Sequence, residues 1–358
     1  MKKYSLLLLI SVHAIFAGKG SFDVKASLPL SNKAYPFGIL RAEYAHLFSS
    51  GIYFYSVFDT EALFVRASQS SGKWFYGVDV SGHLVDWQNL EFIVDREGNL
   101  RKEISIKAAE GKGEIFFGIK SKAHFLKLST GYEVAKLSPR EGDTSLSTSG
   151  QWAWLSAFLG KWKTIFFVPG FKLEDLYILG VQSRWTQKKY VLWWQQYPIS
   201  ISGTNDIAMV GRFGHFWKMK TITMNVSAQT GLSNLAAPGE VRDLTFYFSQ
   251  GGPEKPYRRL AGFAFSEYRA PIYGLVNSDI YWKLAGSFYL WAVVDFLAVD
   301  ANATGSNQWE DNIHSGVGVG SIFRLKSFSI YERIDFALTA KRKGSERLQV
   351  FVGLSGVF

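Results

Sequence analysis

The sequence contains no cysteine, although its first residues have the features of an export signal. Without cysteine, disulfide bonds, thiolate metal sites and cysteine nucleophiles are excluded. An exported chain of 358 residues without disulfides must be held together by an extensive hydrogen-bonded framework. Proline- or serine-rich tracts, blocks of like charge and internal repeats are also missing, so no linker divides the chain.

Long apolar runs are equally scarce. After the N-terminus, no stretch of about 18 apolar residues occurs, and the sequence predicts no transmembrane helix. The start, MKKYSLLLLISVHAIFAGKG, places Lys2 and Lys3 before a short apolar stretch and Ala17, which is typical of a secretory signal peptide. The alternative is an N-terminal membrane anchor, for which the apolar stretch is short. We expect a signal peptide at 1–17, a short periplasmic segment at 18–36 and one transmembrane β-barrel domain at 37–358.

Motifs that carry catalysis are missing as well. The histidines are dispersed, and neither H-E-x-x-H nor G-x-S-x-G spacing occurs. The stretch GVGVG is not a phosphate-binding loop, because neither a helix nor a Lys-Ser pair follows it. We therefore expect no enzymatic activity, no catalytic residue, no metal and no cofactor.

Alternation with a period of two residues recurs along the chain and predicts β-strands. The segment SFSIYERIDFAL is the clearest case, with apolar residues at every second position except Glu332. Its apolar face carries Phe328, Ile330, Ile334, Phe336 and Leu338, and its other face carries Ser329, Tyr331, Arg333 and Asp335. Helical periodicity is rare; LRKEISIKAAEGK is compatible with a short helix or with a strand. The predicted class is all-β, with roughly 14 to 16 strands of about ten residues.

A sheet of that width is expected to close or to split. A soluble sandwich or propeller hides its apolar face, whereas a membrane barrel turns that face to lipid. The C-terminal stretch ERLQVFVGLSGVF favours the barrel, because it alternates up to a terminal aromatic residue. It resembles the C-terminal insertion signal of bacterial outer-membrane proteins, with Leu354 and Phe358 at the signal positions. An open strand edge in lipid would leave backbone groups unsatisfied, so a closed antiparallel barrel is the predicted architecture.

Aromatic residues make up 16% of the chain, and two clusters of them are expected to lie in the interfacial girdles of the barrel. They contain Trp152, Trp154 and Trp162, and Trp193, Trp194 and Tyr197. The alternative is that these side chains form the core of a sandwich. The net charge of +10 suits lipopolysaccharide phosphates or an anionic substrate, or it reflects a solvated surface.

Four features follow one another in the last third of the chain. Leu260, Ala261, Gly262 and Phe263 match a loop motif of the form V/I-R-G-F/Y, and Glu267, Tyr268 and Arg269 follow it. Val293, Asp295 and Leu297 fall on an F-x-D-x-G pattern, and Gly316, Gly318 and Gly320 form a glycine-rich strand. This order resembles the BamA, TamA and FhaC superfamily of outer-membrane insertases and translocation proteins, also called bacterial surface antigens.

The resemblance implies that a long loop folds into the barrel lumen. The loop would carry Arg259, Leu260, Ala261, Gly262, Phe263, Glu267 and Arg269, and Asp295 would be its partner on the barrel wall. Ala261 replaces the arginine that contacts this acidic residue in the family, which leaves Arg258 or Arg259 as candidates to reach Asp295. Leu297 replaces the glycine of the second pattern. No segment of the size of the family's periplasmic POTRA domains precedes the first expected strand, so the resemblance implies a barrel-only member.

The expected function is therefore that of a barrel in the outer membrane of a diderm bacterium, acting in the placement or passage of polypeptide or lipid. POTRA domains hand over client polypeptides in the family, so the resemblance to a barrel-only member does not carry over an insertase role. Two alternatives are a passive porin-like channel for small polar or amphipathic solutes and a structural surface protein. Expected partners are outer-membrane lipid, lipopolysaccharide and the outer-membrane assembly machinery. A client polypeptide and a separate POTRA protein are further candidates; nucleic acid is not expected.

Overall fold

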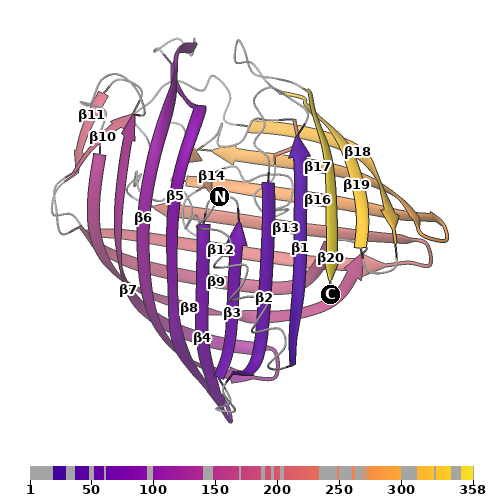
Figure 1. Cartoon of the computed structure of the whole chain (residues 1–358), viewed down its shortest axis with the longest axis horizontal. Helices are drawn as coiled ribbons and strands as arrows, with labels where there is room; N and C mark the ends of the chain where they lie inside the picture. Colours follow the sequence, from indigo (N-terminus) through magenta and orange to yellow (C-terminus); the bar gives the residue numbers. More distant parts are fainter. Residues whose placement is uncertain are drawn as a thin grey trace, which may run out of the picture.

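A computed structural model describes most of the chain after residue 18. It describes residues 19–29, 37–47, 52–59, 62–94, 100–139, 148–168, 171–186, 190–194, 197–201, 205–233, 248–249, 260–262, 269–270, 272–299, 313–325, 328–339 and 348–357. Every regular element in this part of the chain is a β-strand (Figure 1). Among these residues there is no helix long and apolar enough to cross a membrane.

The first half of the chain contributes long strands. They are β1 (Lys19–Pro29), β2 (Phe37–Leu47), β3 (Ile52–Asp59), β4 (Ala62–Ser71), β5 (Trp74–Val94), β6 (Leu100–Ser121), β7 (His124–Pro139), β8 (Thr148–Val168) and β9 (Phe171–Thr186). The second half adds β10 (Tyr190–Trp194), β11 (Tyr197–Ile201), β12 (Asn205–Lys218), β13 (Ile222–Ser233), β14 (Phe248–Ser249), β15 (Arg269–Ala270), β16 (Ile272–Ala285), β17 (Phe288–Val299), β18 (Ile313–Arg324), β19 (Phe328–Ala337) and β20 (Leu348–Val357).

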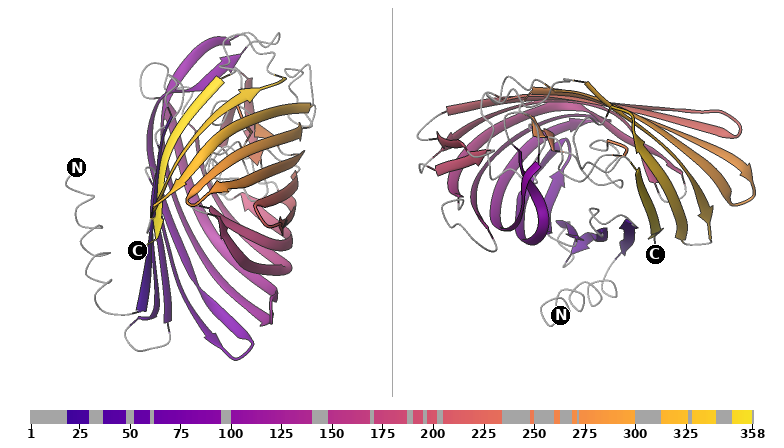
Figure 2. Two further views of the ribbon diagram at one scale, coloured as in Figure 1. Left: turned by 90° about the vertical axis from the view of Figure 1, so that its right-hand side faces the viewer. Right: turned by 90° about the horizontal axis from the view of Figure 1, so that it is seen from above.

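All of these strands except four belong to one antiparallel sheet in which chain neighbours pair. The order runs from β1 to β9, then through β12, β13 and β16 to β20. It returns to its start, because β1 also pairs with β20 from Asp23 opposite Val357 to Pro29 opposite Phe351. The sheet curves round an interior (Figure 2). The remaining strands form two small sheets, β10 with β11 and β14 with β15.

The predicted all-β class is confirmed, while one predicted boundary is wrong. Residues 18–36 were expected to precede the sheet, but Lys19–Pro29 form β1, which pairs with both β2 and β20. Its sequence KGSFDVKASLP does alternate, yet its small and charged residues make the pattern weak. Pairing on both edges, which sequence periodicity does not register, holds this strand in place. The ambiguous segment at 100–112 lies in β6 and is therefore a strand.

The two faces of the sheet are inverted relative to those of a soluble protein. In β19, Arg333 and Asp335 are each 1% exposed, whereas Ile330 and Ile334 are more than 40% exposed. The same inversion recurs on other strands, where the most exposed apolar side chains include Ile115, Leu179 and Val319. Soluble proteins bury such residues and almost never fully bury charges. The polar face of the alternation thus lines the interior and the apolar face points outward.

Connections between strands differ in length at the two ends of the sheet. At one end, the hairpins β4–β5, β6–β7 and β16–β17 turn within two residues, at 72–73, 122–123 and 286–287. At the other end, the chain between β13 and β16 runs from residue 234 to 271, and that between β17 and β18 from 300 to 312. Short turns at one end and long loops at the other are typical of outer-membrane barrels.

Leu179, in the middle of β9 and 62% exposed, tests whether the outward face contacts lipid. We expect Leu179→Arg to destabilise the protein folded in phosphatidylcholine vesicles by about 1–3 kcal/mol, because a charge among acyl chains loses its hydration to an extent that depends on depth. Guanidinium titration followed by tryptophan fluorescence measures the change. Leu179→Ile is the matched control and should stay within about 0.5 kcal/mol of the original chain. Equal stability of the arginine variant and the original chain would show that this face does not contact acyl chains.

Candidate functional site

The inward wall made by β16, β17, β18 and β19 carries the most deeply buried polar residues of the described chain. Asn277, Asp279, Asp295, Arg333 and Asp335 are each no more than 1% exposed. They share one face because alternate residues of a strand point the same way and the strands are in register, with Asn277 opposite Asp295. Buried charges are costly unless they are paired or hydrogen-bonded, so the contacts of these groups define the site.

Asp295 connects this wall to the chain segment that precedes β16. One carboxylate oxygen, Oδ2, accepts a hydrogen bond from the backbone N–H of Ala261 at 2.9 Å. The other, Oδ1, accepts one from the Asn277 side-chain amide at 2.8 Å. Hydrogen bonds to a charged acceptor are stronger than neutral ones, and Asp295 is completely buried. The carboxylate therefore anchors a short stretch of the β13–β16 connection to the wall.

That stretch fits against the wall because glycines make room for it. Gly262 has a φ of 79°, and a Cβ there would collide with the backbone of Phe336 and Ala337 in β19. On the facing strand β18, a Cβ at Gly316 would collide with the carbonyl oxygen of Ala261. Ala261 itself is 1% exposed. Three strands of the sheet thus enclose residues 260–262. Larger side chains at Gly262 or Gly316 would not fit in this space.

Next to this contact lies an ion pair in an aromatic surround. The guanidinium of Arg333 donates two hydrogen bonds to Asp335, each 2.6 Å long. Its central carbon lies 4.4 Å from the centre of the Trp291 ring, a cation–π distance. The Trp291 indole N–H in turn donates to Asp279 at 3.0 Å, and the side-chain amide of Asn225 donates to the same carboxylate at 3.4 Å. One polar network therefore spans from β13 to β19.

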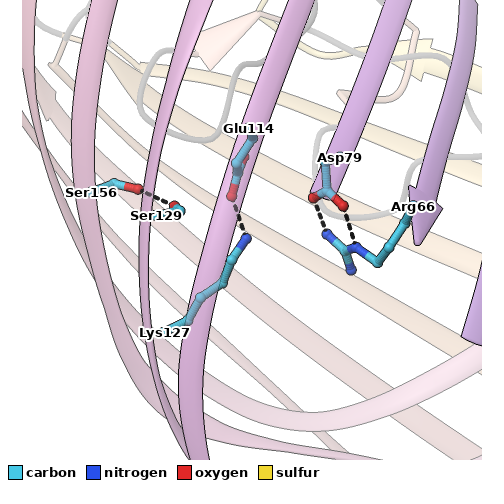
Figure 3. Close-up of polar contacts among 6 residues, drawn as sticks. All are labelled: Arg66, Asp79, Glu114, Lys127, Ser129 and Ser156. Carbon is cyan, nitrogen blue, oxygen red and sulfur yellow. Dashed lines mark hydrogen bonds and ion pairs between the residues drawn. The ribbon is translucent and has the colours of Figure 1, made fainter. Parts of the chain in front are cut away.

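The wall made by β4 to β8 carries a second set of inward polar contacts (Figure 3). These contacts are Arg66–Asp79 at 2.7 and 2.5 Å, Lys127–Glu114 at 2.5 Å and Ser129–Ser156 at 2.8 Å. Asp79 and Glu114 stand opposite each other in the register of β5 and β6. Like charges at such positions repel, and the cation beside each carboxylate offsets that repulsion. The interior is therefore lined by charge on this side too.

The structure brings some of the sequence-predicted residues together and says nothing of others. Leu260, Ala261 and Gly262 lie against the wall, and the backbone of Ala261 bonds to Asp295. Val293 and Leu297 are also buried there. Arg258, Arg259, Phe263, Glu267 and Phe358 lie outside the described residues, as does the signal peptide expected at 1–17. Arg269 lies in β15, although its side chain is not described, and Leu354 is 40% exposed on β20.

Sequence reasoning missed the role of Arg333. It placed Arg333 and Asp335 on the polar face of their strand but assigned them no partner. Their spacing of two residues is the one local signal of the pair, because side chains at i and i+2 point to the same side. The contact with Trp291 depends on β17, β18 and β19 being neighbours, and the sequence of a single strand carries no information on that pairing.

One part of the expected aromatic girdle is wrong. Trp154 is 2% exposed, because it shares the inward face of β8 with the buried Ser156. There the ammonium of Lys112 lies 4.8 Å from the centre of its ring. Trp162, in contrast, is 51% exposed. The side chains of Trp152, Trp193, Trp194 and Tyr197 fall in the part of the chain whose side chains are not described.

Comparison with known proteins gives no match to any protein-family model and none to any curated protein. Solved structures do match. CdiB from Acinetobacter baumannii aligns over 95% of this chain, with a TM-score of 0.62 and 9% identity. CdiB from Escherichia coli gives 0.59, and BamA from Haemophilus ducreyi lacking POTRA domains 1–3 gives 0.58, both over 95% of this chain and at 11% identity.

This chain has the fold of the CdiB and BamA barrels. The resemblance expected from the loop motif and the glycine-rich strand is thereby confirmed at the level of fold. The chain covers 60% and 63% of the two CdiB chains and 70% of the BamA chain. At 9–11% identity, the likeness concerns the arrangement of strands.

Gly316→Ala tests whether residues 260–262 depend on the space that this glycine leaves. We expect a loss of about 1–3 kcal/mol in the free energy of unfolding, because the new methyl group collides with the Ala261 backbone. Proteolysis of the β13–β16 connection in detergent micelles should also become faster. Gly274→Ala in β16 is the matched control, because a Cβ there has nothing within 4 Å. Equal behaviour of the two variants would contradict the enclosure of residues 260–262 by the wall.

Proposed function

We propose that the chain forms a closed transmembrane barrel of about 16 strands in the outer membrane of a diderm bacterium. One observation carries the proposal: apolar side chains point out of the sheet while charged side chains are buried inside it. Water would make that arrangement unfavourable, whereas acyl chains favour it. The pairing of β1 with β20 supports closure, since it leaves neither of these strands with an open edge.

The barrel acts, in this proposal, in the placement or passage of polypeptide or lipid at the outer membrane. Two findings support it: the fold shared with BamA and CdiB, and the contact between Ala261 and Asp295. The segment around Leu260–Gly262 folds into the lumen, where it plugs and stiffens the barrel. Partners are outer-membrane lipid, lipopolysaccharide and the assembly machinery, with a client polypeptide or a separate POTRA protein as further candidates. Catalysis, metal and cofactor have no part in the proposal.

A second candidate is a passive channel for small polar or amphipathic solutes. The paired charges on β4 to β7 favour it, since Arg66–Asp79 and Lys127–Glu114 give the interior a hydrophilic wall. Arg66 is 34% exposed at its side chain and Asp79 is 7% exposed, so the pair borders accessible space. A pore of this kind would conduct ions steadily, whereas a barrel plugged by residues 260–262 would not.

Conductance of the purified chain in planar bilayers separates the two candidates. We expect small, irregular openings from the original chain, because the anchored segment obstructs the lumen. Asp295→Asn should raise the mean conductance several-fold, since an amide in place of the carboxylate weakens the bond to the Ala261 N–H by about 1–2 kcal/mol.

The matched control is Asp79→Asn, which removes one interior negative charge from the opposite wall without touching residues 260–262. It should change conductance little. A large, stable pore from the original chain would favour the passive channel. Identical conductance of the original chain and Asp295→Asn would contradict the proposed lock.

A further inference from the structure

An exposed basic residue accompanies each short hairpin from β4 to β19. In the four hairpins whose turn residues are described, it lies in the turn or within three residues of it, and in β8–β9 and β18–β19 it lies on the strand that leads to the turn. These residues are Lys73, Lys122, Lys163, Lys220, Lys283 and Arg324. One base for each turn places positive charge all along this edge of the sheet.

We call the short-turn edge that carries these six residues the basic rim. Backbone hydrogen bonds link four of these hairpins to the strand end beside them. The Lys120 N–H donates to the Lys73 carbonyl at 2.7 Å, and the Trp162 N–H donates to the Ala123 carbonyl at 3.0 Å. Further round, equivalent bonds join Lys283 to Thr221 at 2.7 Å and Arg324 to Ser287 at 2.8 Å. The bases therefore sit side by side on one edge.

A band of outward aromatic side chains lies directly next to the basic rim. Each member is on the apolar face of its strand, close to a short turn, and is 40–48% exposed. The members are Trp74, Phe117, Tyr177, Trp217, Trp282 and Phe323. Trp74 and Phe117 stack at 5.1 Å, and the Lys73 ammonium lies 5.5 Å from the centre of the Trp74 ring. Aromatic bands of this kind mark the level of lipid headgroups.

Lys122 is held in the rim at a conformational cost. It has a φ of 54°, the only non-glycine residue with positive φ in the described chain. The same first position of the two-residue turn is glycine in two other hairpins, Gly72 with φ 59° and Gly286 with φ 47°. Glycine adopts this conformation without strain, whereas a lysine does not. A base at this position therefore points to a use for its charge.

Acidic side chains are mostly kept away from the basic rim. Six of the eight acidic residues with described side chains are buried in the interior. Of the other two, Glu332 lies within the outward face of β19, and Asp175 lies near the rim. Asp175 bonds to Lys161 at 3.0 Å and to His215 at 3.3 Å. The described rim is thus strongly positive, with a headgroup-level aromatic band beside it.

We propose that the basic rim binds the phosphate headgroups of anionic phospholipids in the leaflet on the short-turn side. The inference rests on the proposed transmembrane barrel, since only an inserted barrel brings the aromatic band and the rim to the headgroup level. Bases near an anionic surface attract it, and the attraction is screened by salt. The rim thereby fixes the depth of the barrel and concentrates anionic lipid around its base.

Spin-labelled lipids test this in the membrane itself. The full chain is reconstituted in vesicles of phosphatidylcholine, and trace spin-labelled phosphatidylglycerol or phosphatidylcholine is added. Electron paramagnetic resonance measures, for each labelled lipid, the fraction whose motion is restricted by contact with the protein. We expect the protein to prefer phosphatidylglycerol over phosphatidylcholine roughly fivefold, which is about the factor that one well-placed basic residue contributes. High salt should reduce this preference.

Two variants of equal charge separate the rim from net charge. The rim variant carries Lys73→Gln, Lys122→Gln, Lys163→Gln and Lys220→Gln and should lose most of the preference. The control carries Lys188→Gln, Lys189→Gln, Lys341→Gln and Lys343→Gln, outside the described residues, and should keep it. The inference is overturned if the original chain restricts both lipids equally, or if both variants lose the preference for phosphatidylglycerol to the same extent. An acidic protein is then the partner of the basic rim. Absence of any restricted lipid instead overturns the transmembrane barrel.

Discussion

Backbone hydrogen bonding along the strand edges is the constraint on which the rest of this structure depends. A sheet with an apolar outer face in lipid has no water to satisfy an exposed edge, and each unsatisfied group costs several kcal/mol. Pairing of β1 with β20 meets this requirement over seven residue pairs, from Asp23 to Pro29. The same need explains why Lys19–Pro29 is a strand despite its weak pattern: its position is fixed by two neighbours.

Because the apolar face points outward, the polar side chains on the other face need hydrogen-bond or ion-pair partners inside. Charges there occur in partnership, as in Arg333 with Asp335 and Arg66 with Asp79. Breaking one partner of such a pair leaves an uncompensated charge, so the pairs act as units. Where the wall meets residues 260–262, the partner of the carboxylate is a backbone N–H. The interior is thus shaped by electrostatic balance as much as by packing.

Strand alternation allowed most of the fold to be predicted, because inward and outward faces differ in polarity along each strand. The face assignments of Phe328–Ala337 follow from local spacing alone, whereas the wall position of Asp295 was implied by the family resemblance. Contacts across strands could not be predicted this way. Trp154 was expected at the interface, but it lies on the inward face of β8, where it is opposite Gly131 of β7. The Arg333–Trp291 contact needs the neighbour order of β17 to β19, and the Lys122 turn needs backbone geometry.

Ala261 stands where the motif expected from the sequence has an arginine, yet residue 261 still contacts Asp295. With Ala261 at that position, the carboxylate of Asp295 accepts a hydrogen bond from the backbone N–H of residue 261. Any residue except proline supplies an N–H, so the contact no longer depends on side-chain identity at 261. It depends on close approach, which Gly262 and Gly316 permit. A guanidinium is still present nearby, but β19 supplies it as Arg333. The contact therefore requires the two glycines and the carboxylate, and places no demand on the side chain at position 261.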